Sequence, residues 1–274
     1  MTESKKGHLK ILFMVLFFYI LGGEVFIIKK KKTISEIIIA LIVAVIIATL
    51  GLGGENKKTV EIPQGSAVSI KESPFIYGSI NFDEIPAYSG KPYVEVNNNV
   101  PFFKNVDLKN DSFEYYSPLD SLGRCGTASA SIGQDLFPKG ERGKIGMIKP
   151  SGWCQNKYSF VDGKYLYNRC HLIGWQLSGE NANERNLITG TRTFNNLGML
   201  PFENMVTDYI KETGNHVLYR VTPYFEGDDL VARGVLMEGE SVEDKGEGIL
   251  FCTFVYNCEP GVTIDYFTGE NKKS

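Results

Sequence analysis

The chain has 274 residues and a formal net charge of −3, from 29 lysine and arginine against 32 aspartate and glutamate side chains. Residues 1–53 hold seven of the basic side chains and three of the acidic ones, so the remainder carries a net charge of about −7. Proteins that bind polyanions over a wide surface usually have a basic excess. The charge therefore argues against a broad nucleic-acid-binding surface and restricts any such contact to a local site.

The five cysteines include no Cys-x-x-Cys pair and no Cys/His zinc spacing. Cys252 and Cys258 lie six residues apart in a predicted strand, which separates them by about 20 Å and excludes a disulfide between them. Cys154 and Cys170 flank a hairpin-like segment, so a bridge between these two stays open. Otherwise the sequence predicts free or buried thiols.

Two apolar runs, at residues 9–28 and 34–53, begin the chain. Each has about 20 residues, the length that crosses the hydrocarbon core of a lipid bilayer, although Glu24 weakens the first run as a span. Four consecutive lysines at 29–32 lie between the runs, and the positive-inside rule places them in the cytoplasm. Residues 1–53 are therefore predicted to be a membrane anchor of one or two transmembrane helices, as a two-span hairpin, with everything after it extracellular. The alternative is that both runs are core helices of a soluble protein.

Residues 54–75 are polar, contain two prolines and show no helical or strand period, as in a linker or stalk. A domain is predicted at 76–274, where short runs rich in Val, Ile, Phe and Tyr alternate with turn residues. These runs lie at 92–96, 113–116, 125–131, 144–149, 187–191, 216–224, 230–238, 249–257 and 262–266. Asp162 and Gly163 predict a hairpin turn at 158–167, whose second strand delivers residues 168–171.

One amphipathic helix is predicted after residue 200. Pro201 falls at its first position and Gly214 ends it, and its apolar side chains recur at helical spacing: Phe202, Met205, Val206, Tyr209 and Ile210. Several strands with few helices predict an α+β domain with a mainly antiparallel sheet.

The residues with the clearest chemical potential lie around this helix and the strand before it. His171 follows a predicted strand end, where an imidazole can accept a proton from water near neutral pH. Asn195 and Glu203 bracket the helix start and supply neutral and charged oxygen atoms, which suit a hard cation. The structural alternative, which spacing alone favours, is that Asn195 is a turn residue and Glu203 favours the helix N-terminus electrostatically. His216 lacks such neighbours in the sequence and is interpreted as a loop or strand-start residue.

The sequence around His171 resembles the Asp-Arg-Gly-His signature of the DNA/RNA non-specific endonucleases, the ββα-metal nucleases. Here the four positions are Asn168, Arg169, Cys170 and His171. Asn186, Asn195 and Glu203 follow at the positions where this family has its other site residues, and residues 85–93, 119–124 and 150–153 resemble the streptodornase-like branch of secreted and membrane-bound nucleases. The resemblance covers roughly residues 76–270.

The resemblance implies a role for each of these residues. His171 would be the general base that deprotonates water, and Asn195 the direct ligand of one Mg²⁺, with Mn²⁺ as a substitute. Glu203 would orient metal-bound water, and Asn186 would support the histidine or the phosphate. An arginine would bind phosphate, with Arg142 favoured over Arg124.

The implied function is a membrane-anchored extracellular endonuclease that hydrolyses DNA, with RNA as an open second substrate. Asn168 and Cys170 depart from the signature. If the usual aspartate orients the histidine, then Asn168 supplies no charge and His171 would be a weaker base. Two alternatives therefore stay open: a catalytically weak or inactive surface module that binds nucleic acid, and a structural protein in which His171 belongs to polar core packing.

Overall fold

The computed structural model describes residues 80–103 and 110–274, so the expected anchor at 1–53 and linker at 54–75 lie outside the described residues. Within the described ranges, no helix has both the length and the apolar character needed to cross a bilayer.

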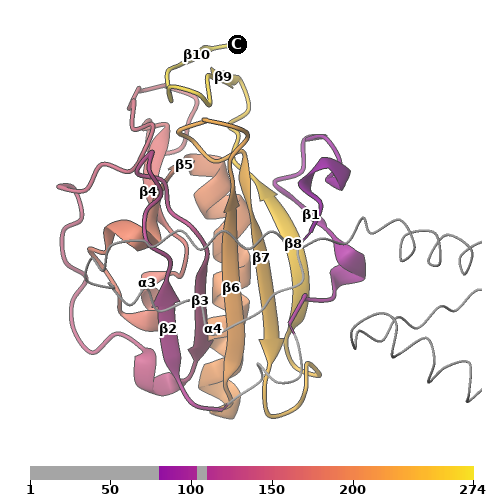
Figure 1. Cartoon of the computed structure of the whole chain (residues 1–274). Coiled ribbons are helices and arrows are strands. Elements are labelled where there is room, and N and C mark those ends of the chain that lie inside the picture. Colours follow the sequence, from indigo (N-terminus) through magenta and orange to yellow (C-terminus); the bar gives the residue numbers. More distant parts are fainter. Residues whose placement is uncertain (1–79, 104–109) are drawn as a thin grey trace, which may run out of the picture. The chain divides into compact units, whose positions relative to one another are not determined.

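A six-stranded antiparallel sheet forms the centre of the domain, with strand order β1-β8-β7-β6-β3-β2 (Figure 1). The alternation of apolar and polar residues explains its register, because successive side chains of a strand point to opposite faces. The strands are β1 (Tyr93–Glu95), β2 (Phe113–Tyr116), β3 (Ala128–Ile132), β6 (Val217–Tyr224), β7 (Gly234–Ser241) and β8 (Leu250–Tyr256). The predicted α+β class with a mainly antiparallel sheet is confirmed.

Helix α4 (Leu200–Thr213) packs across one face of this sheet, behind β6 and β7 in Figure 1. Its buried Val206 and Ile210 belong to the same apolar core as Tyr219 of β6 and Met237 of β7. A proline lies in its first turn, and Gly214 ends it with a left-handed φ of 75°, a conformation that costs a glycine little. The helix is thus the one that the sequence predicts, fixed by its apolar face and its two ends.

A π-helical turn (Phe194–Met199, η5), which the sequence did not indicate, leads directly into α4. Gly198 within it lies so close to β8 that a methyl group there would be 2.3 Å from Val255 Cγ1. Such turns often occur at functional sites because they redirect side chains out of the regular helical spacing.

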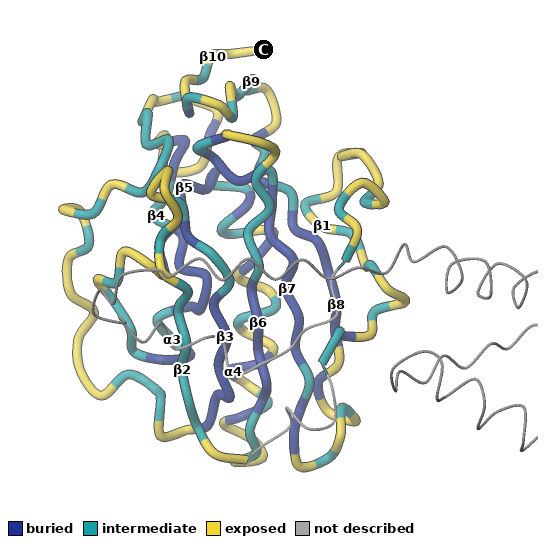
Figure 2. Tube along the Cα trace, viewed as in Figure 1, coloured by how far each residue is buried: buried dark blue, intermediate teal, exposed yellow. Residues whose placement is uncertain are grey.

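A separate two-stranded hairpin lies ahead of α4 in the chain and completes a ββα unit. It pairs β4 (Tyr167–His171) with β5 (Leu187–Thr191) in antiparallel register, with His171 opposite Leu187. All of β5 is buried, whereas β4 is buried at its two ends and half-buried at Asn168 and Arg169 (Figure 2). His171 therefore has a fixed position at the end of a strand.

Short elements connect these units. They are the 3-10 helices η1 (Phe82–Glu84), η2 (Asn97–Asn99), η3 (Gln134–Leu136) and η4 (Glu184–Asn186), the one-turn helix α3 (Trp175–Ser178), and a terminal hairpin of β9 (Val262–Ile264) and β10 (Asn271–Lys273).

Two expectations about local structure were wrong, and one open alternative is decided. Residues 144–149 form no strand, because the Arg169 side chain, and not a neighbouring strand, bonds the carbonyls of Gly146 and Ile148. Strand β7 begins at Gly234 and not at 230, since the N–H groups of Leu230 and Val231 both donate to Tyr266 O. The disulfide left open between Cys154 and Cys170 is absent, and the predicted free thiols are found at all five cysteines.

Candidate active site

An open cavity of about 800 Å³ lies beside the ββα unit. Its wall combines the end of β4, the loop before β4, helix α3, the turn after β5 and the first turn of α4. The residues with chemical potential that line it are Arg142, Asn168, Arg169, His171, Trp175, Arg192, Asn195 and Glu203. The fold therefore brings together four of the five predicted site residues.

His171 is 6% exposed, and both of its ring nitrogens have defined neighbours. Nε2 lies 2.9 Å from the Asn181 carbonyl oxygen, and Nδ1 lies 3.4 Å from Arg142 Nη2. Because a carbonyl only accepts, Nε2 carries the proton and Nδ1 keeps its lone pair. The ring is thus held in the tautomer that presents a proton acceptor beside Arg142.

The electrostatics of the site keep this imidazole neutral. Burial lowers the pKa of His171 to about 4, the Asn181 hydrogen bond opposes this change, and the Arg142 charge adds to it. A pKa below neutral means that the acceptor form is the populated one at pH 7.

Asn195 presents an amide oxygen to the cavity from the π-helical turn. Its Nδ2 donates to Asn196 Oδ1 at 2.9 Å, which fixes the amide plane. Oδ1 receives no hydrogen bond from the described part of the chain.

Glu203 extends from the first turn of α4, and its carboxylate has no hydrogen bond or ion pair within the described ranges. Burial raises the pKa of Glu203 to about 7, while the Arg142 charge lowers it. The carboxylate lies against Gly174, where a methyl group would be 2.7 Å from Oε2. Only glycine leaves room for this carboxylate.

The donor set formed by Asn195 and Glu203 fits a hard cation. An amide oxygen and a carboxylate, each without a protein donor, are the ligand types that Mg²⁺ takes when it keeps several waters. The described residues contain no group of three or more His, Cys, Asp or Glu side chains that could hold a metal. A cation bound here would therefore have few protein ligands and would leave most of its positions to water and substrate oxygens.

Asn186 lies outside the cavity lining and is fully buried. Its Oδ1 accepts from Ile173 N at 2.9 Å, its Nδ2 donates to Ile173 O at 3.0 Å, and its own carbonyl accepts from Leu172 N. With both amide groups used in this way, Asn186 holds the chain one and two residues beyond His171. This geometry fits support of the histidine and not contact with phosphate.

The structure separates the two arginine candidates for phosphate binding. Arg142 lines the cavity, and its Nη2 lies 3.4 Å from His171 Nδ1. Arg124 pairs with Asp120 at 2.7 Å and stacks on Phe225 at 4.8 Å, and it is not part of the cavity lining.

Two further arginines, which sequence reasoning missed, also line the cavity. Arg169 stacks on Trp153 at 4.1 Å and donates to the carbonyls of Gly146 and Ile148, so it ties the loop after Arg142 to β4. The sequence did contain a signal for Arg169, because this residue is the arginine of the family signature itself. The other is Arg192, which follows β5 directly and carried no sequence signal.

Asn168 does not contact His171. Its Oδ1 accepts from Arg192 Nη1 at 3.4 Å, and its buried Nδ2 has no hydrogen-bond partner among the described residues. The histidine is oriented instead by the backbone carbonyl of Asn181. The side chain at position 168 therefore has no direct contact through which it could set the basicity of His171, as the sequence had suggested.

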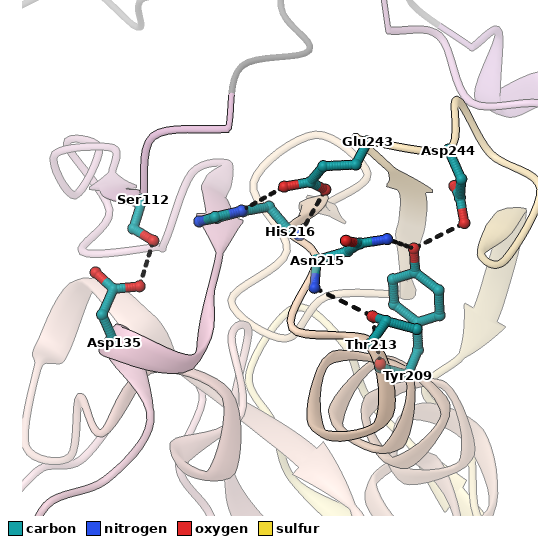
Figure 3. Close-up of polar contacts among 8 residues, drawn as sticks. All are labelled: Ser112, Asp135, Tyr209, Thr213, Asn215, His216, Glu243 and Asp244. Atoms are coloured by element: carbon teal, nitrogen blue, oxygen red, sulfur yellow. Dashed lines mark hydrogen bonds and ion pairs between the residues drawn. The ribbon is translucent and has the colours of Figure 1, made fainter.

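His216 lies away from the cavity, at the start of β6 (Figure 3). Its ring Nδ1 and backbone N each lie 2.7 Å from a Glu243 oxygen. Beside it, Tyr209 of α4 donates to Asp244 Oδ2 at 2.7 Å and accepts from Asn215 Nδ2 at 2.9 Å. These contacts tie the C-terminal end of α4 to the loop after β7, which is a structural role.

Comparison with known proteins agrees with this arrangement. Residues 104–243 match the family model described as DNA/RNA non-specific endonuclease. The curated proteins contain no match.

Solved structures give a second comparison. NucA from Streptococcus agalactiae, solved with a magnesium ion bound, is 25% identical with a TM-score of 0.59, over 66% of this chain and 87% of that one. The same protein with no metal bound is 24% identical with a TM-score of 0.61, over 70% and 92%. The Sda1 nuclease with a bound zinc ion is 31% identical with a TM-score of 0.51, over 59% and 82%.

The family model spans just over half of the chain and contains β4, β5, α4 and the residues around the cavity. The chain belongs to the DNA/RNA non-specific endonuclease family and is a metal-dependent endonuclease.

Proposed function

We propose that the chain hydrolyses internal phosphodiester bonds of DNA, with RNA as an open second substrate, and that His171 is its general base. The observation that carries this proposal is the state of the imidazole. Its Nε2–H is committed to the Asn181 carbonyl, and its neutral Nδ1 faces the cavity beside Arg142. Proton abstraction from water requires a neutral imidazole whose free nitrogen can reach that water, and this tautomer places Nδ1 at the cavity.

In this mechanism His171 Nδ1 takes a proton from the water that attacks phosphorus. The Asn181 carbonyl then stabilises the resulting imidazolium, because it accepts from Nε2–H more strongly once the ring is charged. Arg142 binds a non-bridging oxygen of the same phosphate, since its guanidinium lies only 3.4 Å from Nδ1. The base and the phosphate-binding group are thus neighbours before substrate arrives.

Asn195 would hold one divalent cation directly and Glu203 would hold it through a bound water, the cation being Mg²⁺, with Mn²⁺ as an acceptable substitute. When bound, the cation supplies positive charge at the phosphate and at the departing oxygen. The support is that neither the Asn195 amide oxygen nor the Glu203 carboxylate has a hydrogen-bond partner within residues 80–103 and 110–274, together with the magnesium ion in the NucA structure. Asn186 supports the site from behind through its two bonds to Ile173.

We also propose that residues 1–53 anchor the enzyme in the cell membrane with the nuclease domain extracellular. The support is the two apolar runs and the four lysines between them. Protease treatment of intact cells should digest residues 80–274. Full protection of those residues would contradict this topology.

The experiment that tests the enzymatic proposal is plasmid degradation by the purified chain with Mg²⁺, with EDTA, and with the His171→Ala variant. Cleavage is expected only for the unaltered chain with Mg²⁺. Intact plasmid with both Mg²⁺ and Mn²⁺ would contradict the proposal. If nucleic-acid binding survived in that preparation, the alternative of an inactive surface module would take its place.

A further inference from the structure

Arg192 is a charged residue of the cavity wall that the mechanism above does not use. It follows β5 directly and lies three residues before Asn195, and it lines the same cavity as His171 and Glu203. Its side chain is 33% exposed, so the guanidinium is held by protein on one side and open to solvent on the other.

The contacts of Arg192 fix its guanidinium and leave part of it unused. Nε and Nη2 lie 3.0 and 2.9 Å from the same oxygen, Oδ2 of Asp162, and Nη1 has a longer contact of 3.4 Å with Asn168 Oδ1. Asp162 thus occupies one edge of the planar fork. The Nη1–Nη2 edge remains for a two-point contact with an anion such as phosphate.

The pairing with Asp162 does not prevent this. The Asp162 side chain is 76% exposed, and ion pairs with so much solvent contribute little stability. The pair can therefore orient Arg192 without competing strongly with a phosphate.

The neutral amide of Asn168 does not offset the positive charge of Arg192. Asn168 Oδ1 is the second side-chain partner of Arg192 among the described residues, and it carries no charge. With an aspartate at 168, Arg192 would face two carboxylates, and the cavity would lose about one positive charge. The departure from the signature thus has a physical consequence at Arg192 and not at His171.

We propose that Arg192 binds a second backbone phosphate of the nucleic acid, separate from the scissile one that His171 and Arg142 face, and that Asn168 keeps its charge available. This rests on the proposed function. A second phosphate contact at Arg192 means that the preferred substrate is a nucleic-acid chain with at least two phosphates. A molecule with a single phosphodiester would be a poor substitute.

The test compares kcat/KM of the full chain on duplex DNA and on bis(p-nitrophenyl) phosphate, which has a single phosphate. Arg192→Ala should lower kcat/KM on DNA about tenfold, and it should reduce the slope of log kcat/KM against log salt by about 0.9 for the one lost phosphate contact. Hydrolysis of the single-phosphate substrate should stay within twofold. Arg185→Ala, which removes an exposed arginine outside the cavity lining, is the matched control and should leave the slope unchanged.

Asn168→Asp gives an independent test that keeps the Arg192 side chain. It should weaken activity on DNA several-fold and leave the single-phosphate substrate unchanged. A higher kcat on both substrates would mean instead that position 168 acts on the base, and it would overturn the inference. So would an Arg192→Ala variant with an unaltered salt slope, or with an equal loss on both substrates.

Binding of a fluorescent 20-mer duplex in EDTA separates this inference from the proposed function. If the unaltered chain cleaves neither substrate, the proposed function fails. The slope of the logarithm of the binding constant against log salt, compared between the unaltered chain and Arg192→Ala, still decides the role of Arg192.

Discussion

Gly174→Ala is the sharpest test of the position of Glu203. The added methyl group would lie 2.7 Å from Oε2 and 2.8 Å from Cδ of Glu203, while ordinary contacts begin near 3.4 Å. The carboxylate must therefore move by about 0.7 Å or more. Since a displacement of about 1 Å in a catalytic group can cost 100-fold, kcat should fall between about 10- and 100-fold.

The fold should tolerate this change, because Gly174 has φ −56° and ψ 142°, which alanine adopts without strain. The assay is kcat and KM on plasmid DNA, together with the thermal unfolding midpoint. Gly140→Ala is the matched control, since a methyl group there meets nothing within 4 Å. In a Glu203→Ala background the Gly174 substitution should cost less than a further twofold, because the clashing carboxylate is gone. A kcat within twofold of the unaltered enzyme would refute the reasoning.

The remaining predictions concern protonation and support of the site. Because burial lowers the pKa of His171 from 6.5 to about 4, the unfolded chain binds the extra proton first as pH falls. The free energy of unfolding should therefore decrease between pH 6.5 and 4, by up to about 3 kcal/mol, and His171→Gln should remove that part of the dependence in urea titrations. Glu203 has the opposite sign, since its pKa rises from 4.5 to about 7, and ionising it in the folded state costs stability as pH rises through this window. Glu203→Gln should consequently raise stability in EDTA at pH 8 by about 1–2 kcal/mol while activity is lost, and a less stable variant would argue against a strained carboxylate. Asn186→Ala leaves the N–H and C=O of Ile173 unpaired in the interior and should cost about 2–4 kcal/mol, measured as a lower unfolding midpoint. Asn183→Ala, which removes only a surface bond to a backbone N–H, should cost about 1 kcal/mol or less.

The parts of the fold that the sequence predicts are those with local signals. Strand β5 has the predicted bounds 187–191, and α4 ends at the predicted glycine. In each, one short pattern of apolar residues and one turn residue determine the structure. Strand β7 was misplaced at its start because backbone contacts to Tyr266, distant in sequence, decide where pairing begins.

The residues of the candidate site also divide into those with a local sequence signal and those placed by contacts distant in sequence. His171, Asn195 and Glu203 could be proposed from residue type and from the family signature. Arg192 could not, because its position depends on Asp162 from another hairpin. The Asn181 carbonyl could not be proposed either, since every residue has a carbonyl and only the fold selects one.

The bond between His171 and the Asn181 carbonyl has a consequence for how the enzyme can be inactivated. A carbonyl belongs to the main chain, so no single side-chain replacement deletes it. A substitution can therefore break this bond only by removing the imidazole itself or by moving the loop as a whole. A small molecule that inserts between residues 171 and 181 would achieve what point mutation cannot: it would free Nε2 and allow the ring to present the wrong nitrogen to water.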